Sequence, residues 1–273
     1  MDNNDLTADY TQWERGKDYP EFFDEVALST ISKGYLLPGE TPKKAYRRVA
    51  HAVAMRLNRP DLESKFFKYI WNGWIGLASP VLSNTGTDRG LPISCFGVDT
   101  PDSIRGIGLT NAELMKLTSQ GGGVGIGLSK IRERGTTIKG NGKSEGVVPW
   151  AKIFDSTIIA TNQGSVRRGA ASVNLDINHE DIREFLQIRR PKGDPNRQCL
   201  NLHQCVSIDD SFMKKLHDRD TEAMDVWLEI LKSRVETGEP YVVYIDTVNR
   251  QIPQHHKLAG LKVKTSNLCS EIT

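Results

Sequence analysis

The sequence predicts an α/β protein in which a mainly helical N-terminal region precedes a sheet of parallel strands. Two observations predict this class. Up to about residue 84, apolar residues recur at helical spacing. From Leu91 onward, short apolar segments of strand length alternate with longer amphipathic segments, which indicates parallel strands joined by right-handed crossovers. We therefore expect an irregular arm over residues 1–19, a helical region over 20–84 and an α/β region over 85–273.

Three helices are expected in the helical region. Residues 21–37 carry apolar side chains at near-helical spacing, and Pro38-Gly39 ends this segment. Thr41 and Pro42 are the residue types of an N-cap and a first helical position, so a second helix begins there. A third helix is expected over residues 60–74.

Five strands and five helices are expected in the α/β region. The strand candidates are the apolar runs at 93–98, 124–128, 171–175, 202–208 and 241–245. The helix candidates lie at 103–119, 149–162, 179–189, 209–217 and 221–237. We expect the functional site in the loops at the strand ends, because a rigid scaffold commonly carries its functional residues there.

Composition narrows the classes of function. A hydrophobic content of 38% with 26% charged residues is typical of a soluble globular protein. No apolar run approaches the roughly 18 residues of a membrane span, and the polar, acidic start is not a secretory signal. The net charge of +2 is too small to indicate nucleic-acid binding. We therefore expect a cytoplasmic protein with neither DNA nor a membrane as its partner.

The four cysteines, Cys95, Cys199, Cys205 and Cys269, are widely spread and form no Cys-x-x-Cys pair. This spacing argues against a disulfide framework and against a zinc ribbon. Cys199, His203 and Cys205 are close in sequence, but their spacing is unusual for zinc and a fourth ligand is not apparent. We expect local packing there, and no metal site.

Two glycine-containing segments resemble nucleotide-binding motifs only superficially. Gly-Gly-Gly-Val-Gly-Ile-Gly at 121–127 follows a predicted helix and runs into a strand, which is the reverse of the dinucleotide fingerprint. Close approach of another backbone inside a barrel explains it better. Gly-Asn-Gly-Lys-Ser at 140–144 lacks the earlier glycine of a P-loop, since Thr137 stands there. Its basic flanks suit either a triphosphate or solvent.

The end of the chain, Ser-Asn-Leu-Cys-Ser-Glu at 266–271, concentrates reactive side chains. In an extended segment Asn267, Cys269 and Glu271 project from one face, about 7 Å apart at each step. An amide, a thiol and a carboxylate then share one wall of a site. The alternative is that Cys269 is simply a small buried apolar residue and its neighbours are solvated.

Four separated motifs resemble the large chain of ribonucleotide reductase. They are Leu-Ala-Ser-Pro-Val-Leu-Ser-Asn at 77–84, Leu-Pro-Ile-Ser-Cys-Phe-Gly at 91–97, Asn-Gln-Gly-Ser-Val-Arg-Arg-Gly at 162–169 and the segment 266–271. They occur in the family's order, and the resemblance runs from about Leu36 to the end. It implies a helical region followed by the first part of a ten-stranded α/β barrel. The barrel would be incomplete in this chain, because the family's large chain usually continues well past Glu271.

The resemblance implies radical reduction of ribonucleotides to deoxyribonucleotides for DNA synthesis. Cys269 matches the thiyl radical position, which removes hydrogen from C3′ of the ribose. Glu271 matches the base for the 3′-hydroxyl, and Asn267 the amide beside it. Cys95 matches the thiol that reduces C2′ from the other face of the sugar. The remaining implied positions are Ser79 and Ser94 for the substrate, Asp102, Ser103 and Arg132 for the effector, and Gln163 and Arg167 for the specificity loop.

The resemblance also implies partners and cofactors. This chain would bind no cofactor of its own, and its allosteric effector would be ATP or a deoxynucleoside triphosphate. The radical would come from a separate metal-containing small subunit in class I, or from cobalamin in the class II alternative. We expect a split ribonucleoside-diphosphate reductase large subunit that needs a complementary C-terminal polypeptide, forms a homodimer when completed and is re-reduced by thioredoxin or glutaredoxin. A catalytically dead nucleotide-binding remnant is the alternative, but retention of four matching catalytic residues argues against it.

Overall fold

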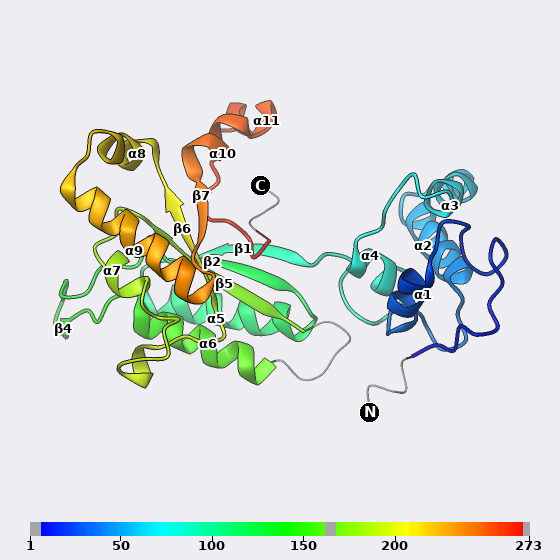
Figure 1. The fold of residues 1–273 in the computed structure, drawn as a ribbon, viewed down its shortest axis with the longest axis horizontal. Helices are drawn as coiled ribbons and strands as arrows, with labels where there is room; N and C mark the ends of the chain where they lie inside the picture. The colour runs from blue at the N-terminus through cyan, green and yellow to red at the C-terminus, as the bar shows by residue number, and fades with distance from the viewer. Residues whose placement is uncertain (1–6, 162–167, 270–273) are drawn as a thin grey trace. The chain divides into compact units, whose positions relative to one another are not determined.

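The computed structural model of the chain describes residues 7–161 and 168–269, which form two compact units (Figure 1). One unit comprises the described residues up to Ser94, and the other those from Cys95 onward. Each unit has its own cluster of buried hydrophobic residues. In the part of the chain that is described, no helix has the length and apolar character needed to cross a bilayer.

The first unit is helical, as predicted. Its helices are α1 (Glu25–Ser32), α2 (Pro42–Arg56), η2 (Pro60–Leu62), α3 (Glu63–Trp71) and α4 (Ser79–Asn84). The expected cap begins α2, since Thr41 Oγ1 accepts a hydrogen bond from the backbone N–H of Lys44 at 3.4 Å. The sequence did not predict α4, which has too few residues to show a period. Arg48 of α2 fixes the end of α4 by donating to the carbonyl oxygens of Leu82 and Thr85.

The second unit is built on a five-stranded parallel sheet. Its strands are β1 (Cys95–Asp99), β2 (Gly123–Gly127), β5 (Ala170–Asp176), β6 (His203–Ile208) and β7 (Tyr241–Tyr244), in that spatial order. All four pairings are parallel, and strands that follow one another in this order are neighbours in the sheet. The five predicted strands and their parallel arrangement are confirmed.

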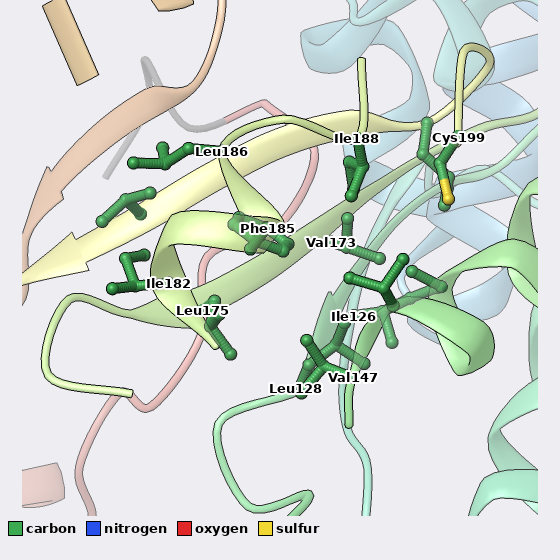
Figure 2. Packing of buried hydrophobic residues seen from close by; sticks show 14 of the residues in the cluster. Ile126, Leu128, Val147, Val173, Leu175, Ile182, Phe185, Leu186, Ile188 and Cys199 are labelled. Carbon is green, nitrogen blue, oxygen red and sulfur yellow. The ribbon is translucent and has the colours of Figure 1, made fainter. Parts of the chain in front are cut away.

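Helices connect these strands. They are α5 (Ile104–Ser119), α6 (Val148–Thr161), α7 (Ile182–Phe185), α8 (Asp210–His217) and α9 (Thr221–Thr237). Leu114 of α5, Phe154 of α6 and Phe185 of α7 share one buried cluster with Ile126 of β2 and Val173 of β5. Figure 2 shows side chains of β2, β5 and α7 meeting in this cluster. The helices therefore cover the face of the sheet to which these strand residues point.

One expectation about secondary structure is corrected, and several short elements were not predicted. The helix expected over 179–189 is only the four residues of α7, because the chain turns after Phe185. A short hairpin, β3 (Thr137–Ile138) and β4 (Gly142–Lys143), and two short helices, α10 (Ile245–Gln251) and α11 (Gln254–Leu258), were not predicted. Residues 261–269 form no strand.

The two faces of β2 differ in side-chain size. Val124 and Ile126 are fully buried and point to the helix-covered face. Because side chains alternate along a strand, Gly123, Gly125 and Gly127 lie on the opposite face. That face of β2 presents bare backbone, and the C-terminal segment approaches it there (Figure 1).

Candidate active site

Two cysteines that are 174 residues apart in the sequence meet on the glycine face of the sheet. Cys95 is the first residue of β1, and Cys269 lies near the end of the described chain; both are half-buried. Their sulfur atoms are 3.2 Å apart, which is contact without the roughly 2.05 Å bond of a disulfide. The sequence predicts both residues as catalytic, and the structure brings them together.

This contact bears on the arrangement expected around a sugar. The resemblance places Cys95 and Cys269 on opposite faces of the ribose. A sugar ring does not fit between two sulfur atoms 3.2 Å apart. The two sulfurs must therefore separate before a nucleotide can occupy that position.

Glycine explains how the C-terminal segment approaches β2. A Cβ atom at Gly125 would lie 2.0 Å from the carbonyl oxygen of Ser266 and 2.6 Å from Cα of Asn267. A Cβ atom at Gly127 would lie 3.2 Å from Cβ of Thr265. The backbone of residues 266–267 thus lies directly on the backbone of β2, and the side chain of Thr265 lies beside it. This confirms the close approach predicted from the glycine run, although the sequence did not identify the approaching segment.

Asn249 of α10 holds the same segment upstream. Its side-chain Oδ1 accepts a hydrogen bond from the backbone N–H of Val263 at 2.8 Å, and its Nδ2 donates to the Val263 carbonyl at 2.9 Å. Both backbone groups of Val263 are thereby satisfied by one amide. This contact could not be predicted from the sequence, because α10 is a single short helix without a recognisable period.

Asn267 is half-buried on the segment that lies over Gly125. Within the described residues, its Oδ1 atom and Oγ of Ser266 are buried without a hydrogen-bond partner. Buried polar atoms without a hydrogen-bond partner are uncommon in folded proteins. These two acceptors suit donors from outside the chain, such as sugar hydroxyl groups. A bend at Leu268 replaces the expected extended geometry between Asn267 and Cys269.

The three residues expected to bind an effector lie close together. Arg132 Nε donates to Asp102 Oδ2 at 2.8 Å, and both side chains are about one-third exposed. Ser103 is the N-cap of α5, where its Oγ accepts from the backbone N–H of Gly106 at 3.0 Å. A cation, a carboxylate and a helix N-terminus therefore meet beyond the carboxyl ends of β1 and β2. This is a suitable setting for an anionic ligand.

The other predicted site residues are placed as follows. Ser79 is the first residue of α4 in the first unit, and its Oγ lies 3.2 Å from the hydroxyl oxygen of Tyr35. Ser94 is the last residue of the first unit and directly precedes Cys95. Gln163, Arg167 and Glu271 lie outside the described residues.

The remaining two cysteines are packing residues. Cys199 and Cys205 are fully buried, and Cys199 belongs to the hydrophobic cluster behind the sheet (Figure 2). His203 lies between them in the sequence. Its Nδ1 atom is 2.5 Å from Oε1 of Glu239, and its ring stacks on the ring of Tyr241. Burial raises the pKa of both thiols to about 12.

The raised pKa values predict selective alkylation. In the folded chain at pH 8 the Cys199 and Cys205 thiols stay protonated, so iodoacetamide should label Cys95 and Cys269 alone. Peptide mass mapping measures this labelling, and all four cysteines should be labelled in urea. Labelling of Cys199 or Cys205 in the folded chain would contradict the burial.

The raised pKa values also predict a dependence of stability on pH. Because the unfolded thiols ionise near pH 9.0 and the folded ones do not, the contribution of these thiols to the free energy of unfolding should be full below pH 9 and fall as pH rises toward 12.

Comparisons with known proteins agree across both units. The family profile described as "Ribonucleotide reductase, barrel domain" matches residues 93–222 and 217–273, and "Ribonucleotide reductase, all-alpha domain" matches residues 21–90. The ribonucleoside-diphosphate reductase large subunit of Invertebrate iridescent virus 6 is 34% identical, over 90% of this chain and 27% of that protein. The corresponding large subunit of Arabidopsis thaliana is 31% identical, over 92% of this chain and 36% of that protein.

A solved structure is also similar. The Actinobacillus ureae class Id ribonucleotide reductase alpha subunit superposes with a TM-score of 0.81 at 32% identity. The match covers 91% of this chain and 45% of that chain. The chain therefore spans less than half the length of these relatives.

Proposed function

The chain belongs to the ribonucleotide reductase family, and from this premise we propose that it supplies the N-terminal half of the catalytic site of a ribonucleoside-diphosphate reductase large subunit. The observation that carries the proposal is the contact of the Cys95 and Cys269 sulfurs at 3.2 Å. Both thiols occupy positions that match the family's chemistry, although they are far apart in the sequence. A purely structural pair of half-buried thiols has no need of this juxtaposition.

Cys269 is the proposed radical residue. As a thiyl radical, its sulfur would take a hydrogen atom from C3′ of the ribose, forming an S–H bond and leaving the radical on carbon. Glu271 would take the proton of the 3′-hydroxyl group. The buried Oδ1 of Asn267, which has no partner among the described residues, supports a role in accepting a hydrogen bond from a sugar hydroxyl.

Cys95 is the proposed reducing thiol. The C2′ hydroxyl would leave as water, and two thiols would supply two protons and two electrons while forming a disulfide. The products are then a deoxynucleotide, water and one disulfide for each nucleotide. In this proposal the second reducing thiol comes from a complementary C-terminal polypeptide, while Ser94 and Ser79 contact the substrate.

The radical and the regulation come from other molecules. Similarity to a class Id alpha subunit fits a separate radical-generating small subunit, as in class I, and a cobalamin-dependent reaction is the alternative. The pair formed by Asp102 and Arg132, together with Ser103, would bind the effector's sugar and phosphates, and Gln163 and Arg167 would carry the signal to the substrate. The completed large subunit would form a homodimer in the cytoplasm and be re-reduced by thioredoxin or glutaredoxin.

Nucleotide reduction tests the proposal. The chain is combined with its complementary C-terminal polypeptide and a radical-generating subunit, and conversion of a nucleoside diphosphate is measured with and without a deoxynucleoside triphosphate. Effector-dependent deoxynucleotide is the expected product. An assembly that binds the effector and yields no product would favour a nucleotide-binding remnant instead.

Substrate binding should also protect the cysteine pair from cross-linking. Dibromobimane joins neighbouring thiols because each thiolate displaces one bromide. A nucleoside diphosphate at ten times its Kd leaves about one tenth of the sites free, so joining of Cys95 to Cys269 in the completed assembly should slow about tenfold. Inorganic pyrophosphate, which lacks the sugar, is the control. An unchanged rate at saturating nucleotide would contradict the placement of the sugar between the sulfurs.

A further inference from the structure

We propose that Gly125 is a positioning residue, which seats the segment that carries Cys269 so that its sulfur reaches Cys95. The inference rests on the proposed function of the cysteine pair and identifies what sets the distance between the two sulfurs. Gly125 lies at the centre of β2, and the atoms nearest to a Cβ added there belong to the backbone of Ser266 and Asn267. Its effect is on the path of the backbone that leads to Cys269.

The space at Gly125 is smaller than any side chain. Besides the 2.0 Å approach to the Ser266 carbonyl oxygen, an added Cβ would lie 2.6 Å from Cα and 2.9 Å from the carbonyl carbon of Asn267. Favourable contacts between such atoms begin near 3.5 Å. All three atoms belong to the backbone, so no side-chain rotation can relieve the overlap. Residues 266–267 would have to move by at least about 1 Å.

The requirement at Gly125 is for space and not for an unusual backbone angle. Gly125 is absent from the glycines that adopt positive φ, and it pairs in regular parallel register with Gly97 of β1 and Ser172 of β5. Alanine can adopt the same strand conformation. Substitution at this position therefore acts through the segment above the strand, and the strand itself can remain intact.

Displacement at Asn267 is expected to reach Cys269 directly. The segment is fixed upstream by the two hydrogen bonds between Asn249 and Val263, so it cannot slide away as a whole. Cys269 follows Asn267 by two residues. A shift of about 1 Å at Asn267 is a large fraction of the 3.2 Å that separates the sulfurs, and misplacement of this size is enough to disturb a reaction geometry.

Two neighbouring glycines provide matched controls on the same face of the sheet. A Cβ at Gly97 would lie 3.9 Å from Cγ2 of Thr265, which is an ordinary contact. A Cβ at Gly127 would lie 3.2 Å from both Cβ of Thr265 and Oδ1 of Asp99, which requires only a small adjustment of these two side chains. The three positions contact one segment but differ in the room they leave. Their alanine variants should form a graded series.

The test is the rate at which dibromobimane joins Cys95 to Cys269 in the 273-residue chain. Gly97→Ala should cross-link within about twofold of the original chain, Gly127→Ala more slowly, and Gly125→Ala at least about tenfold more slowly. Protection of the buried Cys199 and Cys205 from iodoacetamide reports, for each variant, that the second unit has folded. Cross-linking of folded Gly125→Ala at the original rate would overturn the proposal.

Three further outcomes are also decisive. If Gly125→Ala exposes Cys199 and Cys205, the comparison passes to Gly127→Ala, which must cross-link more slowly than Gly97→Ala for the proposal to stand.

Because cross-linking requires no turnover, the positioning role and the reductase function can fail separately. A graded series with no nucleotide reduction would refute only the function, and reduction by an assembly with no graded series would refute only the positioning role.

Discussion

Replacing Cys269 with serine is expected to abolish nucleotide reduction by the completed assembly, with a loss of at least about 10³-fold, or about 4 kcal/mol in the barrier. An alcohol in place of the thiol cannot serve as the hydrogen-abstracting radical, because its O–H bond is much stronger than an S–H bond. The substitution is nearly isosteric and the side chain is only half-buried, so the fold should persist. Product formation is measured by chromatography of the nucleosides.

Effector binding separates this catalytic effect from a structural one. The proposed effector residues lie on other segments of the chain; they are Asp102, Ser103 and Arg132. The Cys269→Ser assembly should therefore bind a deoxynucleoside triphosphate with unchanged affinity. Cys199→Ala is the matched control, since that thiol is buried in the hydrophobic cluster and contributes packing alone. Substantial turnover by Cys269→Ser would remove Cys269 from the mechanism.

Truncating Phe185 to alanine is expected to lower the free energy of unfolding of the second unit by about 3–5 kcal/mol. Its ring is completely buried and packs in the cluster between α7 and the sheet (Figure 2). Removing the ring from a closely packed core loses its contacts and leaves a cavity that the surrounding structure fills only partly. Urea unfolding of Phe185→Ala, followed by the exposure of Cys199 and Cys205, measures the change.

Val235→Ala provides the control for Phe185→Ala. Val235 lies on α9 in the same unit but is 87% exposed, so its truncation should change the free energy of unfolding by no more than about 0.5 kcal/mol. If both variants unfold at the same urea concentration as the original chain, Phe185 does not support the core as the structure indicates.

The sequence was sufficient to predict the framework of both units. Parallel strands buried by helices appear as short apolar runs, which is why β2 and β5 could be located from Val124 and Ala171 onward. The start of α2 was marked by the side chain that caps it, since Thr41 accepts a hydrogen bond from the N–H of Lys44 at 3.4 Å. The short helices α4, α10 and α11 were not predictable, because about one turn contains too little of the helical period.

The site could be predicted residue by residue but not as a geometry. Cys95 and Cys269 each matched a family position, yet their contact depends on how a segment without regular secondary structure crosses β2. The alternating glycines indicated that some backbone approaches closely, and only the structure shows that residues 266–267 do so. The shared face of Asn267, Cys269 and Glu271 required an extended segment, and a bend at Leu268 lies between the first two of them. The roles of all the predicted site residues stay predictions, and Gln163 and Glu271 lie outside the described residues.

The most direct test of the account is a map of which cysteines dibromobimane joins in the folded chain, read by peptide mass spectrometry. The structure predicts a single linkage, between Cys95 and Cys269, with Cys199 and Cys205 unmodified. A folded chain in which Cys269 is alkylated without being joined to Cys95 would contradict the pairing on which the proposed catalytic site depends.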